Sequence, residues 1–140
     1  MEQKIEYIHT VQYYETDKMG ITHHSNYIRW MEEARIDMLA QIGWDYAKLE
    51  SLGIVSPVVS VTCDYKRPTT FSDKVTVSVV MKDFGGVKYT FEYEMKNQHG
   101  TVVCVGSSLH ALFNTEGKPI RMKRDYPQLY ETLCTLFPAE

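Results

Sequence analysis

Cysteine is scarce in this chain and follows no pattern that would bind a metal or cross-link the fold. The three residues, Cys63, Cys104 and Cys134, are an odd number without C-x-x-C spacing. Such a set predicts neither a disulfide framework nor a zinc site. Cys63 and Cys104 fall within strand-like patterns, so we interpret both as buried, unreactive thiols.

Long hydrophobic runs are absent as well. No apolar stretch approaches the roughly 20 residues that cross a bilayer, and residues 1–5 lack the apolar core of a signal peptide. We therefore expect a cytoplasmic protein without a membrane span. Repeats, low-complexity segments and linkers are also missing, and 44% hydrophobic and 24% charged residues are ordinary for a folded protein. These features predict one domain over residues 1–140.

An excess of positive charge is the third absence. The formal net charge is −3, which argues against nucleic acid as a general partner. Basic residues do gather locally, at Lys66 and Arg67 and again at Lys118, Arg121, Lys123 and Arg124. These groups are either solvated surface charge or a small phosphate-binding patch, and composition leaves both interpretations open.

The first third of the chain changes its hydrophobic period. Residues 5–13 alternate in polarity, which predicts a half-buried strand with Tyr13 on its apolar face. A helical period follows, and its apolar face carries Tyr27, Trp30, Met31, Ala34 and Met38. Ser25 or Asn26 as N-cap and Gly43 at the other end predict a helix of about 17 residues. The pairs Arg29/Glu33 and Glu32/Arg35 would lie on its exposed face.

Four further strands are expected after a loop at residues 44–49. Alternation predicts strands near residues 59–65, 74–82, 87–96 and 101–113, and turns at 83–86 and 97–100 make the last three antiparallel neighbours. A short helix is expected from Asp125 onward. Because one helix covers a flat sheet poorly, we predict an α+β fold in which a strongly curved five-stranded antiparallel sheet wraps around one long central helix. The last strand is apolar on both faces, which predicts a homo-oligomer.

The chemistry is concentrated in residues 14–27, between the first strand and the helix. This segment contains Asp17, Gly20 and His24. Backbone N–H groups at a helix start are unpaired and partly positive, so they suit an anion or a developing oxyanion. A carboxylate beside them is what hydrolysis of an acyl compound needs. Alternatively, Asp17 only caps loop N–H groups, and His24 contributes only its backbone N–H rather than its imidazole. Asp17, His23 and His24 could also suggest a metal, but adjacent histidines rarely converge on one ion, so we expect none.

The motif also carries a family resemblance. The runs VQYYETDKMGI at 11–21, HSNY at 24–27 and RWMEEAR at 29–35 resemble the 4-hydroxybenzoyl-CoA thioesterase family, and especially its bacterial acyl-CoA thioesterases. The resemblance implies a hotdog fold and acyl-CoA hydrolysis without a metal or redox cofactor. It implies Asp17 as the catalytic carboxylate, Gly20 as the point of close approach to substrate, and the His24 N–H as the group that holds the thioester oxygen. It further implies a site at a subunit interface in a homodimer or tetramer.

Substrate chemistry suggests the remaining candidates. Tyr27 would form a pocket wall, and the phosphates of CoA call for basic side chains at the rim. The candidates for those phosphates are Lys66, Arg67, Lys88 and Arg124. The residues that we interpret as structural are Glu15, His9, His99 and His110.

Several alternatives stay open from the sequence. Asp17 could attack the thioester directly or deprotonate a water. The thiol carrier could be CoA or acyl carrier protein, and His23 and the bulky pair Lys18-Met19 depart from the family pattern and leave the acyl preference open. Two rival functions are a hotdog hydratase or dehydratase acting on acyl thioesters, and a module that binds acyl groups or a partner protein without turnover.

Overall fold

A five-stranded antiparallel sheet with the strand order β1-β4-β5-β6-β3 forms the centre of the structure. The computed structural model describes residues 5–138. The strands are β1 (Ile5–Thr10), β3 (Val58–Tyr65), β4 (Lys74–Lys82), β5 (Lys88–Lys96) and β6 (Val102–Ala111). The last three are consecutive antiparallel neighbours, as the short turns predict, and β3 lies at one edge.

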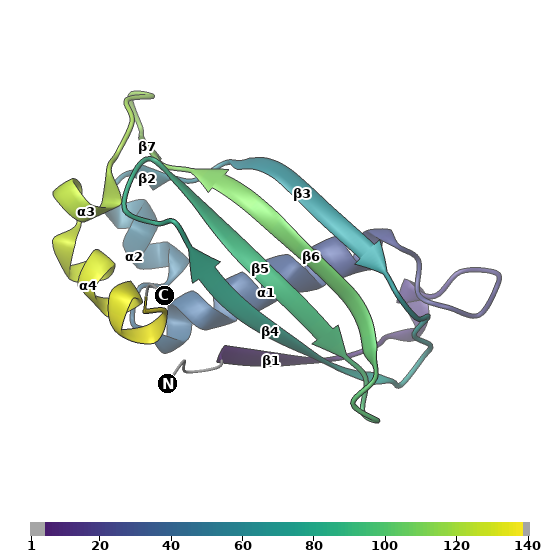
Figure 1. The fold of residues 1–140 in the computed structure, drawn as a ribbon. Coiled ribbons are helices and arrows are strands. Elements are labelled where there is room, and N and C mark those ends of the chain that lie inside the picture. Colours follow the sequence, from purple (N-terminus) through teal and green to yellow (C-terminus); the bar gives the residue numbers. More distant parts are fainter. Residues whose placement is uncertain (1–4, 139–140) are drawn as a thin grey trace.

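Helix α1 (Ser25–Gln41) runs along one face of this sheet (Figure 1). It buries Trp30, Met31 and Met38 completely, each at 0% exposure. The sheet approaches the helix so closely that a Cβ at Gly106 in β6 would lie 2.6 Å from Met31 Cε and closer still to the Thr62 carbonyl oxygen. Only glycine fits there. The predicted α+β architecture, a curved five-stranded sheet around one long helix, is confirmed.

The segment before α1 differs from its alternating pattern. β1 ends at Thr10, and the 3-10 helix η1 (Tyr13–Glu15) leaves Tyr13 76% exposed instead of on an apolar strand face. Glu15 stabilises this turn because its side chain accepts a hydrogen bond from the Gln12 backbone N–H at 2.7 Å. Periodicity cannot detect such a local cap.

The sequence predicts the C-terminal end of α1 correctly but misplaces the N-cap residue. Its N-cap is His24, so the sequence-based choice of Ser25 or Asn26 is wrong by one or two residues. The Asn26 side chain instead donates a hydrogen bond to the Glu15 carbonyl at 3.0 Å and ties the helix to η1. The prediction for the other end is correct, because Gly43 follows the C-cap Ile42 with a φ of +81°, a conformation that favours glycine.

Three shorter helices gather at one end of the sheet (Figure 1). They are α2 (Tyr46–Ser51), α3 (Met122–Asp125) and α4 (Pro127–Leu136). The predicted loop at 44–49 is therefore wrong, because Asp45 accepts a hydrogen bond from the Lys48 backbone N–H at 2.9 Å and caps α2. The predicted last strand is divided, since β6 ends at Ala111 and β7 (Phe113–Asn114) pairs with β2 (Ile54–Val55) in a separate small sheet.

The face of α1 that the sequence predicts to be exposed is partly buried. Arg35 is 9% exposed, and neither Arg29 nor Arg35 forms an ion pair with a carboxylate among residues 5–138. The predicted pairs Arg29/Glu33 and Glu32/Arg35 are therefore wrong. Glu33 instead accepts a hydrogen bond from the Tyr7 hydroxyl at 2.6 Å. β1 and the curved sheet enclose more of the helix than an isolated amphipathic pattern can indicate.

No helix within residues 5–138 is long and apolar enough to cross a membrane. Residues 1–4, on which most of the signal-peptide prediction rests, lie outside the described part of the chain.

Candidate active site

A surface groove lies where the segment between β1 and α1 meets the far end of β3, at the opposite end of the sheet from α2, α3 and α4 (Figure 1). It brings together five of the site residues predicted from the sequence with several that were not predicted. The residues that line it are Asp17, Met19, Ile21, Thr22, His24, Tyr27, Tyr65, Lys66, Arg67 and Pro68.

Asp17 sits in a tight loop that its own side chain helps to close. The Asp17 backbone N–H donates to the Ile21 carbonyl and the Gly20 N–H donates to the Asp17 carbonyl, both at 2.9 Å. Gly20 has a φ of +79°, which a residue with a Cβ rarely adopts. Oδ1 of the Asp17 carboxylate accepts a hydrogen bond from the Met19 N–H at 2.8 Å, whereas Oδ2 has no hydrogen-bond partner within residues 5–138. Asp17 therefore caps the loop, as one sequence interpretation predicts, and it also lines the groove.

The loop is held against the strand connection that follows β3. The Thr22 N–H donates to the Thr69 carbonyl at 2.8 Å, and the hydroxyls of these two residues are hydrogen-bonded at 2.6 Å. Tyr27 reaches the same hydroxyl of Thr69 at 3.0 Å, and burial raises the pKa of Tyr27, so its phenol stays neutral. Tyr27, predicted as a pocket wall, is thus buried and lines the groove. Thr69 follows Pro68 in an irregular segment and carried no signal in the sequence.

Glu15 anchors the base of the loop from inside the core. Its carboxylate accepts hydrogen bonds from the indole N–H of Trp30 at 2.8 Å and from the Gln12 N–H at 2.7 Å, and Oε1 lies 2.8 Å from Nε2 of His9. Burial by itself would raise the pKa of Glu15, but these hydrogen bonds outweigh it and lower the pKa below its ordinary value. The Glu15 carbonyl also accepts from the His23 N–H at 2.8 Å. The structural role that the sequence suggests for Glu15 and His9 matches these contacts.

His24 presents two different groups at the groove. Its imidazole is exposed, lies tilted against the His23 ring with 4.3 Å between ring centroids, and makes no hydrogen bond to Asp17. Its backbone N–H has no acceptor within the described residues, because α1 begins at the next position. The His24 carbonyl accepts from the Tyr65 hydroxyl at 3.1 Å. Burial, followed by its contact with Cys63, raises the pKa of Tyr65 to about 12, so this hydroxyl remains a donor at neutral pH.

The four basic candidates divide between the two ends of the molecule. Lys66 and Arg67 line the groove, and both backbone N–H groups donate to the Val103 carbonyl, at 2.8 and 3.2 Å. Lys88 begins β5 opposite Ala111, and Arg124 lies in α3, where its guanidinium donates to Asp125 at 2.8 and 3.0 Å. Within one chain, the structure therefore brings Lys66 and Arg67 to Asp17 but leaves Lys88 and Arg124 at the opposite end of the sheet.

Tyr65 is one of the groove residues that the sequence did not single out. Tyr65 lies at the end of β3, and only the close approach of β3 to α1 brings its hydroxyl to the His24 carbonyl. Across the described residues, no three His, Cys, Asp or Glu side chains gather closely enough to hold a metal ion.

Comparison with known proteins assigns this fold to a family. The sequence model of the Thioesterase-like superfamily matches residues 11–132 of this chain. The putative acyl-CoA thioesterase YneP of Bacillus subtilis is 34% identical over 118 residues, which cover 84% of this chain and 86% of that protein. A structure of the DHNA-CoA thioesterase from Staphylococcus aureus shares 31% identity and a TM-score of 0.87 over 95% of this chain and 90% of the other. The chain therefore belongs to the thioesterase-like superfamily, and the hotdog fold and thioesterase class that its sequence predicts are confirmed.

Proposed function

We propose that this protein hydrolyses acyl-CoA thioesters in the groove, with the Asp17 carboxylate acting on the carbonyl carbon and the His24 backbone N–H binding the carbonyl oxygen. One observation carries this proposal. Within residues 5–138, one oxygen of the Asp17 carboxylate and the His24 backbone N–H before α1 have no hydrogen-bond partner, and both residues line the same groove. The relatives named as acyl-CoA and DHNA-CoA thioesterases support the substrate class.

Thioester hydrolysis requires the protein only to position the attacking group and to stabilise one negative charge on the carbonyl oxygen. Sulfur donates weakly into a thioester carbonyl, so the carbon is already electrophilic and a thiolate leaves readily. Asp17 either adds to that carbon, giving an anhydride that water then opens, or removes a proton from an attacking water. In both routes the C–S bond breaks, CoA departs as a thiol after taking up a proton, and the acyl group leaves as a carboxylic acid. The negative charge on the tetrahedral oxygen is held by the His24 N–H.

The groove also contains positively charged side chains that suit the phosphates of the thiol carrier. Lys66 and Arg67 are exposed on the same wall as Tyr65, within the groove that contains Asp17. Lysine and arginine are the side chains that proteins use to bind phosphate groups. We assign them to the phosphates of CoA, with no cofactor needed besides the substrate itself.

Thiol release from a panel of acyl-CoA substrates tests the proposal. Asp17→Asn keeps the shape of the side chain but removes its charge, and it should lower kcat by about 10²- to 10⁴-fold, the usual contribution of a positioned acid or base. Asp64→Asn, an exposed carboxylate on β3, is the matched control and should keep wild-type activity. His24→Ala should change kcat by less than about tenfold if only the backbone N–H acts.

The outcomes separate the rival functions. An unchanged rate in Asp17→Asn would remove Asp17 from the mechanism. No thiol release from any substrate would favour a non-catalytic binding module. A loss of enoyl absorbance without thiol release would favour a hydratase.

A further inference from the structure

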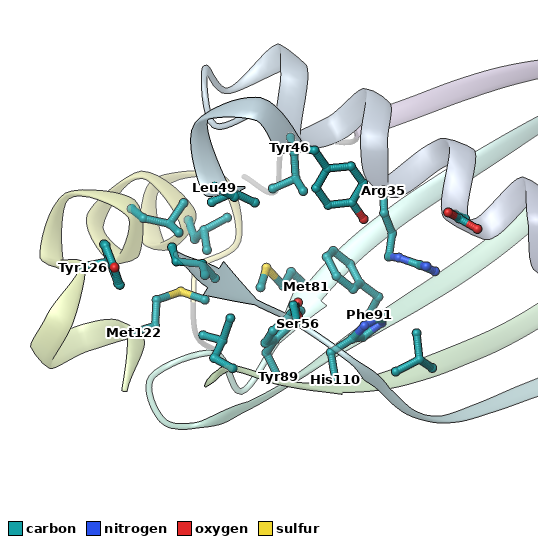
Figure 2. A pocket seen from close by; sticks show the side chains of 17 residues that line it. Arg35, Tyr46, Leu49, Ser56, Met81, Tyr89, Phe91, His110, Met122 and Tyr126 are labelled. Carbon is teal, nitrogen blue, oxygen red and sulfur yellow. The ribbon is translucent and has the colours of Figure 1, made fainter. Parts of the chain in front are cut away.

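His9 on β1 is a buried histidine with a carboxylate on each side of its ring. Nε2 lies 2.8 Å from Glu15 Oε1, and Nδ1 lies 3.2 Å from Glu33 Oε1. The ring is 9% exposed and packs against the Trp30 indole, with 4.7 Å between ring centroids. By contrast, Arg35, the buried arginine of α1, lines an apolar cavity of about 250 Å³ near α2 (Figure 2). His9 is therefore the buried basic side chain that lies directly between two acids.

Glu15 determines the direction of the hydrogen bond on one side of the ring. An ionised carboxylate only accepts hydrogen bonds, so a ring nitrogen that faces one has to donate. Burial alone would raise the pKa of Glu15, but the hydrogen bonds from His9, Gln12 and Trp30 outweigh it and lower the pKa. Glu15 is thus ionised at neutral pH, and Nε2 of His9 carries a proton.

Glu33 determines the direction of the hydrogen bond on the other side. Its Oε1 accepts a hydrogen bond from the Tyr7 hydroxyl at 2.6 Å and faces Nδ1 of His9 with the same atom. Burial, followed by the hydrogen bond to Glu33, raises the pKa of Tyr7, so its phenol stays protonated and donates. The Glu33 side chain is 39% exposed, and water stabilises its charged form. Nδ1 therefore also faces an acceptor and carries the second proton.

No lysine or arginine competes with His9 for these two acids. Within residues 5–138, His9 is the only basic side chain within ion-pair distance of Glu15 or Glu33. Asp37, one turn further along α1, adds a third negative charge near Tyr7. A buried carboxylate without a counter-ion is costly, so a positively charged His9 ring balances the charge of Glu15.

Glu15 connects this ion pair with the groove. Its backbone carbonyl accepts hydrogen bonds from the His23 N–H at 2.8 Å and from the Asn26 side chain at 3.0 Å. Asp17 follows Glu15 after one residue, and His24 follows His23 directly. A displacement of Glu15 would therefore move both the Asp17 carboxylate and the His24 N–H.

We infer that His9 carries a proton on both ring nitrogens at neutral pH and is a positioning residue for thioester hydrolysis. Its charge holds the Glu15 carboxylate, and Glu15 holds the Asp17 loop and the start of α1. His9 does not line the groove, so it acts through Glu15 rather than on the substrate. The protonation of the ring stands by itself, whereas its effect on the reaction rests on the proposed function.

Nitrogen NMR of protein with ¹⁵N-labelled histidine tests the protonation of the ring at pH 7. An imidazolium has two protonated nitrogens, whereas a neutral imidazole has one protonated and one unprotonated nitrogen. The His9 signals are identified by their absence from a His9 variant, and both should be those of protonated nitrogens. An unprotonated nitrogen in the His9 ring, with its proton on Glu33 instead, would overturn the inference.

Two substitutions separate the charge of His9 from its shape. His9→Gln is close to histidine in size but neutral, whereas His9→Lys differs in shape but keeps a positive charge. If the charge positions Glu15, kcat for an acyl-CoA should fall about 10²-fold in His9→Gln, the effect of misplacing reacting groups by roughly 1 Å, and much less in His9→Lys. KM should change little in either variant, because Lys66 and Arg67 are untouched.

His99→Gln, in an exposed turn, is the matched control and should keep the wild-type kcat. A wild-type kcat in His9→Gln, or a lower kcat in His9→Lys than in His9→Gln, would contradict a positioning role for the charge. If His9→Gln does not fold, the wild-type nitrogen spectrum and the kcat of His9→Lys still decide.

Backbone amide chemical shifts measure the position of the loop without turnover. His9→Gln should shift the amide signals of residues 17–24, and His99→Gln should leave them in place. Unchanged signals in folded His9→Gln would refute the connection through Glu15. If the wild-type ring is an imidazolium and these signals move, but the wild type releases no thiol from any acyl-CoA, the charge of His9 and its hold on the loop are supported and only the hydrolytic proposal fails.

Discussion

Replacing Glu15 by glutamine should expose how much one buried carboxylate contributes to this fold. Glu15 is 5% exposed and has three hydrogen-bonding neighbours, the Gln12 N–H, the Trp30 indole N–H and the His9 ring. Hydrogen bonds to a charged group are each worth about 1.5–3 kcal/mol, and a buried donor left without an acceptor costs about 1–3 kcal/mol. In Glu15→Gln, one side-chain oxygen still accepts hydrogen bonds. The amide NH₂ group replaces the other oxygen and faces a donor that it cannot satisfy.

The expected loss in the free energy of unfolding is about 3 kcal/mol, from one lost bond, one unsatisfied donor and the weaker bonds of a neutral acceptor. Urea denaturation at pH 7 measures it. Glu50→Gln on the exposed surface of α2 is the matched control and should change stability by less than about 0.5 kcal/mol.

The pH dependence of the difference in unfolding free energy between wild type and Glu15→Gln provides an independent check. Because the folded-state pKa of Glu15 lies below its ordinary value of 4.5, the stabilisation is complete above that value and is lost as the pH falls through the folded pKa. The gap between wild type and Glu15→Gln should therefore be constant from pH 7 to 5 and shrink below pH 4.5. If Glu15→Gln and Glu50→Gln were equally stable at pH 7, the carboxylate would not anchor η1 to α1.

Three other predictions concern the groove, the core and assembly. Tyr65→Phe removes the hydroxyl that holds the His24 carbonyl, so steady-state kinetics should show kcat reduced several-fold while thermal unfolding changes little, because Tyr65 is exposed; an unaltered kcat would mean that this bond does not position α1. Gly106→Ala forces a methyl group against Met31 and the Thr62 carbonyl and should lower the free energy of unfolding by about 1–3 kcal/mol, whereas Gly86→Ala, where a Cβ meets nothing within 4 Å, should cost less; equal losses in urea denaturation would contradict the close packing. The chain should run as a homodimer or tetramer in size-exclusion chromatography with light scattering, and a monomer at micromolar concentration would refute the prediction that the last strand is covered by another copy.

Local pattern was enough for most of the secondary structure. β4 and β5 were predicted within a residue of their ends, because alternating valines and aromatics next to short turns leave few other arrangements. The motif of residues 14–27 likewise identified Asp17, His24 and Tyr27 as candidates, and the phosphates of CoA suggested Lys66 and Arg67. All five residues line one groove. α2 and the pairing of β2 with β7 were missed, since short elements depend on one cap or on a distant partner.

The sequence by itself determined the curved sheet around one helix and the chemical character of the helix entrance, because both depend on residues close together in the chain. Only the tertiary structure decided which polar side chains are buried and what they face. Arg35 has the spacing of an exposed helix residue, yet the sheet closes over it and sets it against an apolar cavity. Burial is a property of neighbours far away in the sequence, and no local periodicity records it.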